Sequence, residues 1–219
     1  MVLRFVVLFV TAFFVGCSVS TPPNQWQYKS TNSFNSFKKN FLEGNDLLAE
    51  VELKRAISKA SSSADLKQLA RVYLGACALH KAVGLEDDCK EYKKIQNLLE
   101  DKKLDNYYFF INKEFDKVDK RALEERYRPF VEALQEKKIQ NAVDIALKEK
   151  DPLKKLMMIS LLGDKASLTL IDDGIKLLSY YGYKKGVITL LKMKLKGLSD
   201  EQQKRNIQKK IEILENVSL

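Results

Sequence analysis

Apolar residues recur at helical spacing along most of the chain, in blocks that short breaks separate. No stretch alternates strictly between apolar and polar residues, which is the pattern of a half-buried strand. Because short breaks join antiparallel neighbours, the chain is predicted to be all-α, with stacked helical hairpins over residues 34–219. The clearest stripe steps by four and three positions and predicts one helix with a single apolar side: Leu104, Tyr108, Ile111, Phe115 and Val118.

The breaks between the blocks carry residues that begin and end helices. Asp151-Pro152 is one of these breaks. Pro129 falls inside a helical pattern and predicts that a helix starts or kinks there. The remaining breaks are a serine run and single glycines, at Gly44, Gly84, Gly163, Gly182 and Gly197.

The first residues follow a different pattern, in which Arg4 precedes an apolar run over residues 5–15. This arrangement is typical of a secretory signal peptide, and the run is shorter than the roughly 20 residues that span a bilayer. The run ends in Phe14-Val15-Gly16-Cys17, which resembles the lipobox of bacterial lipoproteins, although Phe14 stands where that family usually has leucine. The resemblance implies that residues 1–16 are removed and that Cys17 carries acyl chains. An ordinary signal with an incidental cysteine is the alternative.

Residues 17–33 are rich in Ser, Thr, Asn and Gln and contain Pro22-Pro23. Such a composition buries little apolar surface, so we expect a flexible tether that lifts the helical domain of residues 34–219 off the membrane. Ser18, the residue after the lipobox cysteine, resembles the outer-membrane default of Gram-negative lipoproteins.

The segment from Leu170 to Leu190 resembles one tetratricopeptide repeat, a family built from stacked helical hairpins. That family places a small residue in the first helix and another twelve positions later in the second, where Gly174 and Gly186 stand. Two further partial matches make Ala49 and Ala142 helix-packing residues. The intervals are irregular, so the resemblance implies a short tetratricopeptide-like solenoid without the strict period of about 34 residues. An amphipathic helical bundle is the alternative.

Cys77 and Cys89 stand on either side of Gly84, twelve positions apart, where the same repeat pattern has small residues. On facing antiparallel helices they would lie at similar heights, and an exported protein meets an oxidising compartment. The sequence therefore favours a Cys77–Cys89 disulfide, which would contribute roughly 2–3 kcal/mol to stability. Two small buried side chains are the alternative.

The chain carries a formal net charge of +9, and residues 151–219 hold 13 Lys and Arg against 8 Asp and Glu. An exported protein does not meet nucleic acid, so the polyanions available to it are phospholipid headgroups, lipopolysaccharide and acidic proteins. The candidates for polyanion contact lie in the C-terminal helices: Lys184, Lys185, Lys192, Lys194 and Lys196. A solvated helical face is the alternative interpretation of these lysines.

Side chains that carry chemistry are sparse. His80 is the only histidine, and together with Cys77 it offers too few ligands for a metal site. The chain has no Gly-rich phosphate loop, no nucleophile elbow and no HExxH pattern. Carboxylate pairs such as Asp87-Asp88 lie near predicted helix starts, where the helix dipole explains them. We therefore expect no enzyme, no metal and no cofactor.

The leading interpretation is a non-enzymatic scaffold or assembly factor, anchored in the outer membrane through acyl chains on Cys17 and facing the periplasm. It would bind a peptide or an envelope protein in the groove between hairpins. Resemblance to tetratricopeptide lipoproteins implies a secretin, pilus, flagellar or barrel-assembly complex as its setting. Two alternatives stay open: a protein that contacts lipid, lipopolysaccharide or peptidoglycan through its basic C-terminal helices, and an architectural surface lipoprotein.

Overall fold

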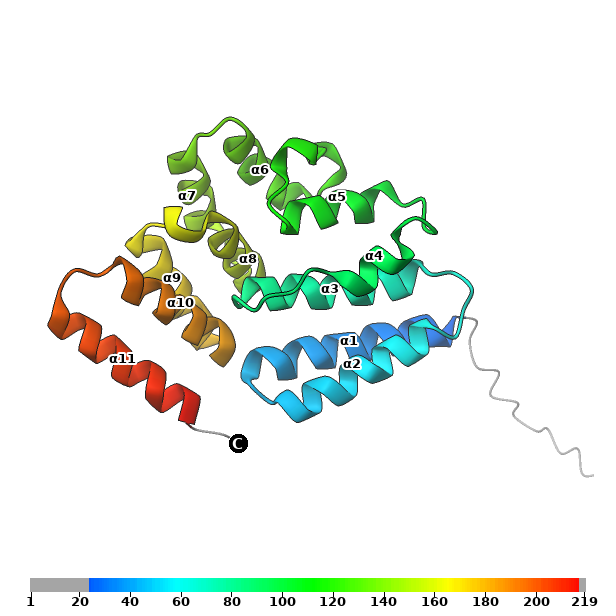
Figure 1. Ribbon diagram of the computed structural model, residues 1–219, viewed down its shortest axis with the longest axis horizontal. Coiled ribbons are helices and arrows are strands. Elements are labelled where there is room, and N and C mark those ends of the chain that lie inside the picture. The colour runs from blue at the N-terminus through cyan, green and yellow to red at the C-terminus, as the bar shows by residue number, and fades with distance from the viewer. Residues whose placement is uncertain (1–23, 217–219) are drawn as a thin grey trace, which may run out of the picture.

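The computed structural model describes residues 24–216, and every regular element in that range is helical (Figure 1). The predicted all-α fold of packed helical hairpins is therefore confirmed. The predicted signal peptide and Cys17 lie outside the described residues. The helices are α1 Gln25–Glu43, α2 Asp46–Ala60, α3 Lys67–Ala82, α4 Lys90–Gln96, α5 Lys102–Ile111, α6 Arg128–Gln135, α7 Ile139–Lys148, α8 Pro152–Leu162, α9 Leu168–Tyr180, α10 Lys184–Gly197 and α11 Glu201–Asn216, with 3-10 turns at Phe115–Lys117, Lys120–Ala122, Glu125–Tyr127 and Gly163–Lys165.

The hairpins pack around one apolar core. α1 and α2 form the first hairpin, α3 packs against both, and α8 packs against α3. The α6–α7 and α9–α10 hairpins follow, and α11 packs on α10 (Figure 1). The contact between α1 and α10 shows that the stack of hairpins curls back on itself. Early and late helices share the core, whose largest fully buried side chains include Tyr92, Phe130, Leu74, Leu156 and Leu190.

The predicted tether is wrong from Gln25 onward, because α1 begins there. Its polar residues face inward in part: Ser30 is fully buried and its hydroxyl donates to the carbonyl oxygen of Ala56, 2.9 Å away. The Gln68 side chain of α3 donates to the same hydroxyl at 3.4 Å. Partners this far away in the sequence satisfy the polar groups, so composition alone does not reveal the helix. Residues 17–23 of the predicted tether lie outside the described range.

The predicted stripe from Leu104 to Val118 does not form one helix. α5 ends at Ile111, where the Asn112 side chain donates to the carbonyl oxygen of Tyr108 at 2.8 Å and Lys113 adopts a left-handed φ of 62°. Phe115 and Val118 still reach the core, but from a 3-10 turn and the residue after it. The apolar spacing therefore predicted correctly that Phe115 and Val118 contact the core, but it predicted too long a helix.

Small residues allow the C-terminal helices to approach closely. A Cβ atom on Gly174 would lie 2.7 Å from both Ile159 Cδ1 and Leu190 Cδ1, and one on Gly186 would lie 3.0 Å from a Leu178 methyl carbon. Ala49 of α2 and Ala142 of α7 are likewise buried. Gly75 makes a further close approach that the repeat pattern does not indicate. A Cβ atom on Gly75 would lie 2.5 Å from the Phe34 ring. Among residues 24–216 no helix is long and apolar enough to cross a membrane.

Candidate functional site

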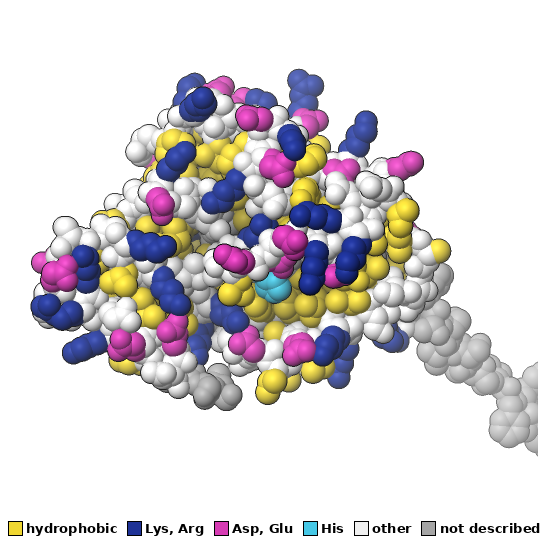
Figure 2. All heavy atoms as spheres, in the orientation of Figure 1, with side chains coloured by type: hydrophobic (Ala, Val, Ile, Leu, Met, Phe, Trp, Pro, Cys, Tyr) yellow, Lys and Arg dark blue, Asp and Glu magenta, His cyan; other side chains and the backbone are white. Residues whose placement is uncertain are grey.

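Four of the five candidate lysines line one hollow of about 570 Å³, which we call the α10 groove. In Figure 1, α10 lies between the α1–α2 hairpin and α11, and these elements form the sides of the groove. Figure 2 shows Lys and Arg side chains intermingled with apolar side chains over this part of the molecule. The groove is lined by the cations Lys184, Lys185, Lys192 and Lys196, the acids Asp46 and Glu215, the apolar residues Val83, Leu85, Ile188 and Met193, and Gly44, Gly84 and Thr189.

The fifth candidate, Lys194, does not belong to the groove. Its ammonium lies 2.6 Å from Asp172 Oδ1 on α9, in an ion pair that joins the two helices of the α9–α10 hairpin. The spacing explains the separation, because Lys194 lies about 200° around the helix from Lys192 and also from Lys196. Lys194 therefore lies apart from the other four candidate lysines.

Two of the groove lysines already have acidic partners. Lys185 Nζ lies 2.7 Å from Asp46 Oδ1 and 4.5 Å from the centroid of the Phe41 ring, and Lys192 Nζ lies 2.7 Å from Glu215 Oε1. Within the described residues, Lys196 has no acidic partner within 4.0 Å. The groove therefore combines balanced charges at its sides with an uncompensated cation on α10.

A second hollow of about 370 Å³ continues the α10 groove past Leu85. It shares Gly84, Leu85, Thr189, Met193 and Lys196 with the first hollow. It adds two further cations, Lys81 and Lys113, and one acid, Asp164. Desolvation lowers the pKa of Lys113, as do the nearby cations of Lys81 and Lys165, while Asp164 opposes this shift. Burial of the Lys113 ammonium is therefore the main cause of the lowered pKa.

No known protein family, curated protein or solved structure matches this chain. The functional argument therefore rests on the groove, and on how the chain holds its lining residues in place.

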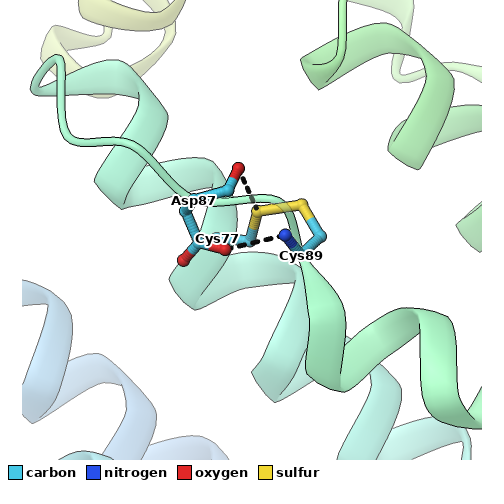
Figure 3. Close-up of side chains that lie close together, drawn as sticks. All are labelled: Cys77, Asp87 and Cys89. Carbon is cyan, nitrogen blue, oxygen red and sulfur yellow. Dashed lines mark hydrogen bonds between the residues drawn. A yellow bond between two sulfur atoms is a disulfide. The ribbon is translucent and has the colours of Figure 1, made fainter.

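A hydrogen bond and a disulfide fix the side of the groove that carries Leu85. The Thr189 hydroxyl lies 2.9 Å from the carbonyl oxygen of Val83, which ties α10 to the end of α3. The structure joins Cys77 of α3 to Cys89 through a disulfide, with Cα atoms 5.4 Å apart (Figure 3). Because Leu85 lies between these two anchor points, the loop presents it at a defined position.

The repeat pattern predicts Cys89 on a helix that faces α3, but Cys89 does not lie on such a helix. It precedes α4, with a left-handed φ of 55°, and its backbone N–H donates to Asp87 Oδ1 at 2.7 Å. The other Asp87 oxygen lies 2.7 Å from His80 Nδ1. The disulfide and the two contacts of the Asp87 carboxylate thus hold the segment between α3 and α4 against α3.

Cys77, Asp87 and Cys89 are also the one group among the described residues in which three potential metal-ligating side chains come together, with their ligand atoms within 4.8 Å of one another. Figure 3 shows both sulfur atoms joined to each other. A disulfide sulfur is not the thiolate that binds metals. In its oxidised form this cluster is therefore a cross-link.

Sequence reasoning missed Leu85, Lys81 and Lys113 as lining residues. Leu85 directly follows the turn glycine Gly84, and an apolar side chain in a break between helices is the signal that could have found it. It is 49% exposed, so the core does not account for it. Lys81 and Lys113 carried no signal, because only the packing of α3, α5 and α8 brings them to the groove.

Proposed function

We propose that this protein is a membrane-tethered, non-enzymatic scaffold that binds an acidic, amphipathic segment of an envelope protein in the α10 groove. The observation that carries the proposal is the lining itself. Apolar side chains from the α3–α4 loop and from α10 face the same hollow as four lysines. A helix or extended peptide with one apolar side and carboxylates beside it would match both features.

The anchor is the second part of the proposal. Acyl chains on Cys17 would hold the scaffold at a membrane, because each buried CH₂ contributes about 0.8 kcal/mol and two chains suffice for stable attachment. We propose the outer membrane and its periplasmic face as the location. Labelling with a clickable fatty acid tests this part: the label is expected on the intact chain and absent after Cys17→Ala. Equal labelling of both would contradict it.

Site-specific photocrosslinking in the native cells tests the groove. A photoreactive amino acid at Ile188, on the groove side of α10, is expected to capture a discrete protein product. The same amino acid at Lys148, an exposed position on α7, is the matched control and is expected to capture none. Identical products from both positions would contradict a groove-specific partner.

Charge variants separate a protein partner from the alternative occupant. The double variant Lys192→Glu with Lys196→Glu is expected to lower the yield of the protein crosslinked from position 188 severalfold. The double variant Lys148→Glu with Lys150→Glu is the control and is expected to leave that yield unchanged. Four lysines in one hollow also suit a phospholipid or lipopolysaccharide headgroup. Crosslinks to lipid or lipopolysaccharide at Ile188, without a protein product, would support that second candidate function.

A further inference from the structure

The outward side of the α1–α2 hairpin exposes a group of large apolar side chains. α2 buries Ala49, Ala56 and Ala60 against the core. The opposite side of the same helix carries Leu47, Leu48 and Val51, which are 83%, 58% and 43% exposed. Exposure of three neighbouring aliphatic side chains is costly in water unless another surface covers them.

Cations lie beside Val51, the last of these three apolar side chains along α2. A shallow groove of about 670 Å³ between α1 and α2 is lined by Val51 together with Lys29, Lys54, Arg55 and Lys59. Lys54 and Arg55 pair with Glu50 and Glu52 of their own helix at 2.5 Å. Within the described residues, Lys29 and Lys59 have no acidic partner. The outward face, which we define as Lys29, Leu47, Leu48, Val51, Lys54, Arg55 and Lys59, is therefore both apolar and net positive.

The length of chain before α1 indicates what covers the outward face. Seven Cα–Cα steps, through residues 18–23, separate the proposed anchor Cys17 from Asn24, the first described residue. Fully extended they span at most about 25 Å, so α1 would begin close to the membrane. α1 is 19 residues long, or about 28 Å, and the hairpin can lie flat beneath such a tether.

We propose that the outward face of the α1–α2 hairpin rests on an anionic phospholipid surface. Leu47, Leu48 and Val51 enter the boundary between headgroups and acyl chains, and the lysines and Arg55 lie against lipid phosphates, as in helices that bind in the plane of a membrane. Tyr28, 68% exposed near the start of α1, is an aromatic side chain of the kind enriched at that boundary. The orientation deepens the proposed function, since it rests on the anchor at Cys17 and determines how the scaffold stands on the membrane.

The test is vesicle co-sedimentation of residues 17–219 with Cys17→Ser, a form that contains every described residue and carries no acyl chain. Vesicles of phosphatidylcholine are compared with vesicles that also contain phosphatidylglycerol. Binding is expected to the anionic vesicles and to fall at high salt. Leu47→Gln with Leu48→Gln is expected to weaken it about tenfold, because two leucines lose their apolar contact with lipid.

Two further variants complete the design. Lys29→Gln with Lys59→Gln is expected to weaken binding to anionic vesicles about tenfold and to leave binding to neutral vesicles unchanged. Lys148→Gln with Lys150→Gln on the α7–α8 side is the matched control and should bind like the parent. None of these side chains is buried in the core.

Equal binding of the outward-face variants and the control would overturn the inference. So would a dimer in solution that Leu47→Gln with Leu48→Gln abolishes while vesicle binding persists, because a second copy would then cover the face. The acylation and crosslinking experiments remain separate. Absence of vesicle binding by the Cys17→Ser form, when the native chain is labelled by the fatty acid in cells, refutes only the orientation. Vesicle binding by that form, when the native chain takes up no fatty-acid label in cells, refutes only the anchor.

Discussion

Lys185 Nζ lies 2.7 Å from Asp46 Oδ1, so a residue of α10 pairs with the first residue of α2 across the curled stack of hairpins. The same ammonium lies over the Phe41 ring at 4.5 Å from its centroid. These contacts join the N-terminal hairpin to the C-terminal one at the edge of the α10 groove.

Substitution of Lys185 should therefore weaken the contact between the N-terminal and C-terminal hairpins. Lys185→Ala is expected to lower the free energy of unfolding by about 1–2 kcal/mol, because it removes both a cation–π contact and an ion pair. A double-mutant cycle with Asp46→Asn, measured by urea denaturation, isolates the ion pair, for which we expect a coupling of up to about 1 kcal/mol. Lys148→Ala is the control and should cost little. A coupling of zero would show that the pair does not hold the hairpins together.

The Cys77–Cys89 disulfide should stabilise the fold and fix the Leu85 side of the groove. Closing so short a loop is expected to contribute about 2–3 kcal/mol, so a reductant should lower the midpoint of urea denaturation. The double variant Cys77→Ser with Cys89→Ser should start from the lower midpoint and show no response to reductant. If the native chain also ignored reductant, the bond would be absent or inaccessible in solution.

Local signals in the sequence indicated the break between helices at Asp151-Pro152 and the helix start at Pro129. Asp151 accepts hydrogen bonds from the backbone N–H groups of Leu153 and Lys154 at the start of α8, and Pro129 occupies the first turn of α6. Both features depend on residues within one helical turn, so a short stretch of sequence contains everything needed to predict them.

Features that depend on distant partners were not predictable in the same way. Residues 25–33 have the composition of a tether, and the sequence does not show that Ala56 and Gln68 provide hydrogen-bond partners for Ser30 in the folded structure. Four of the candidate lysines line the α10 groove and Lys194 pairs with α9, because different helices flank the two sides of α10. Cys89 was predicted on a helix, but it precedes α4, because the pattern did not indicate that a loop would carry it.

Gly174 should be intolerant of even a methyl group. An alanine in the middle of an exposed helix usually gains about 1 kcal/mol over glycine, but here its Cβ would lie 2.7 Å from two methyl carbons of the fully buried Ile159 and Leu190. Overpacking of this kind costs about 1–3 kcal/mol, so we expect Gly174→Ala to destabilise the protein in thermal denaturation.

Two comparisons test the cause. Ile159→Val removes one of the two methyl carbons, and in the Gly174→Ala background it should cost less than it does alone. Gly197→Ala is the control, because its Cβ would meet only the partly exposed Leu168 at 3.1 Å and that side chain has room to move. Additive effects of Gly174→Ala and Ile159→Val would contradict overpacking as the cause.

Tyrosines in or packed against the core should make the fold sensitive to alkali. Burial raises the pKa of Tyr107 from its ordinary value of 10.0 to about 12, and burial likewise raises the pKa of Tyr127, whose ring lies 4.8 Å from that of Phe110. A raised pKa in the folded state means that the unfolded state loses its proton first. The stability contribution is therefore fully present below about pH 10 and is lost as pH rises toward 12, with a slope of up to about 1.4 kcal/mol per pH unit for each tyrosine.

Urea denaturation at pH 8, 10 and 11 measures how steeply the free energy of unfolding falls with pH. Tyr127→Phe is expected to lose part of this slope. Tyr180→Phe is the control and is expected to keep it, because Tyr180 is 85% exposed. An unchanged slope in Tyr127→Phe would assign the alkaline instability to other groups.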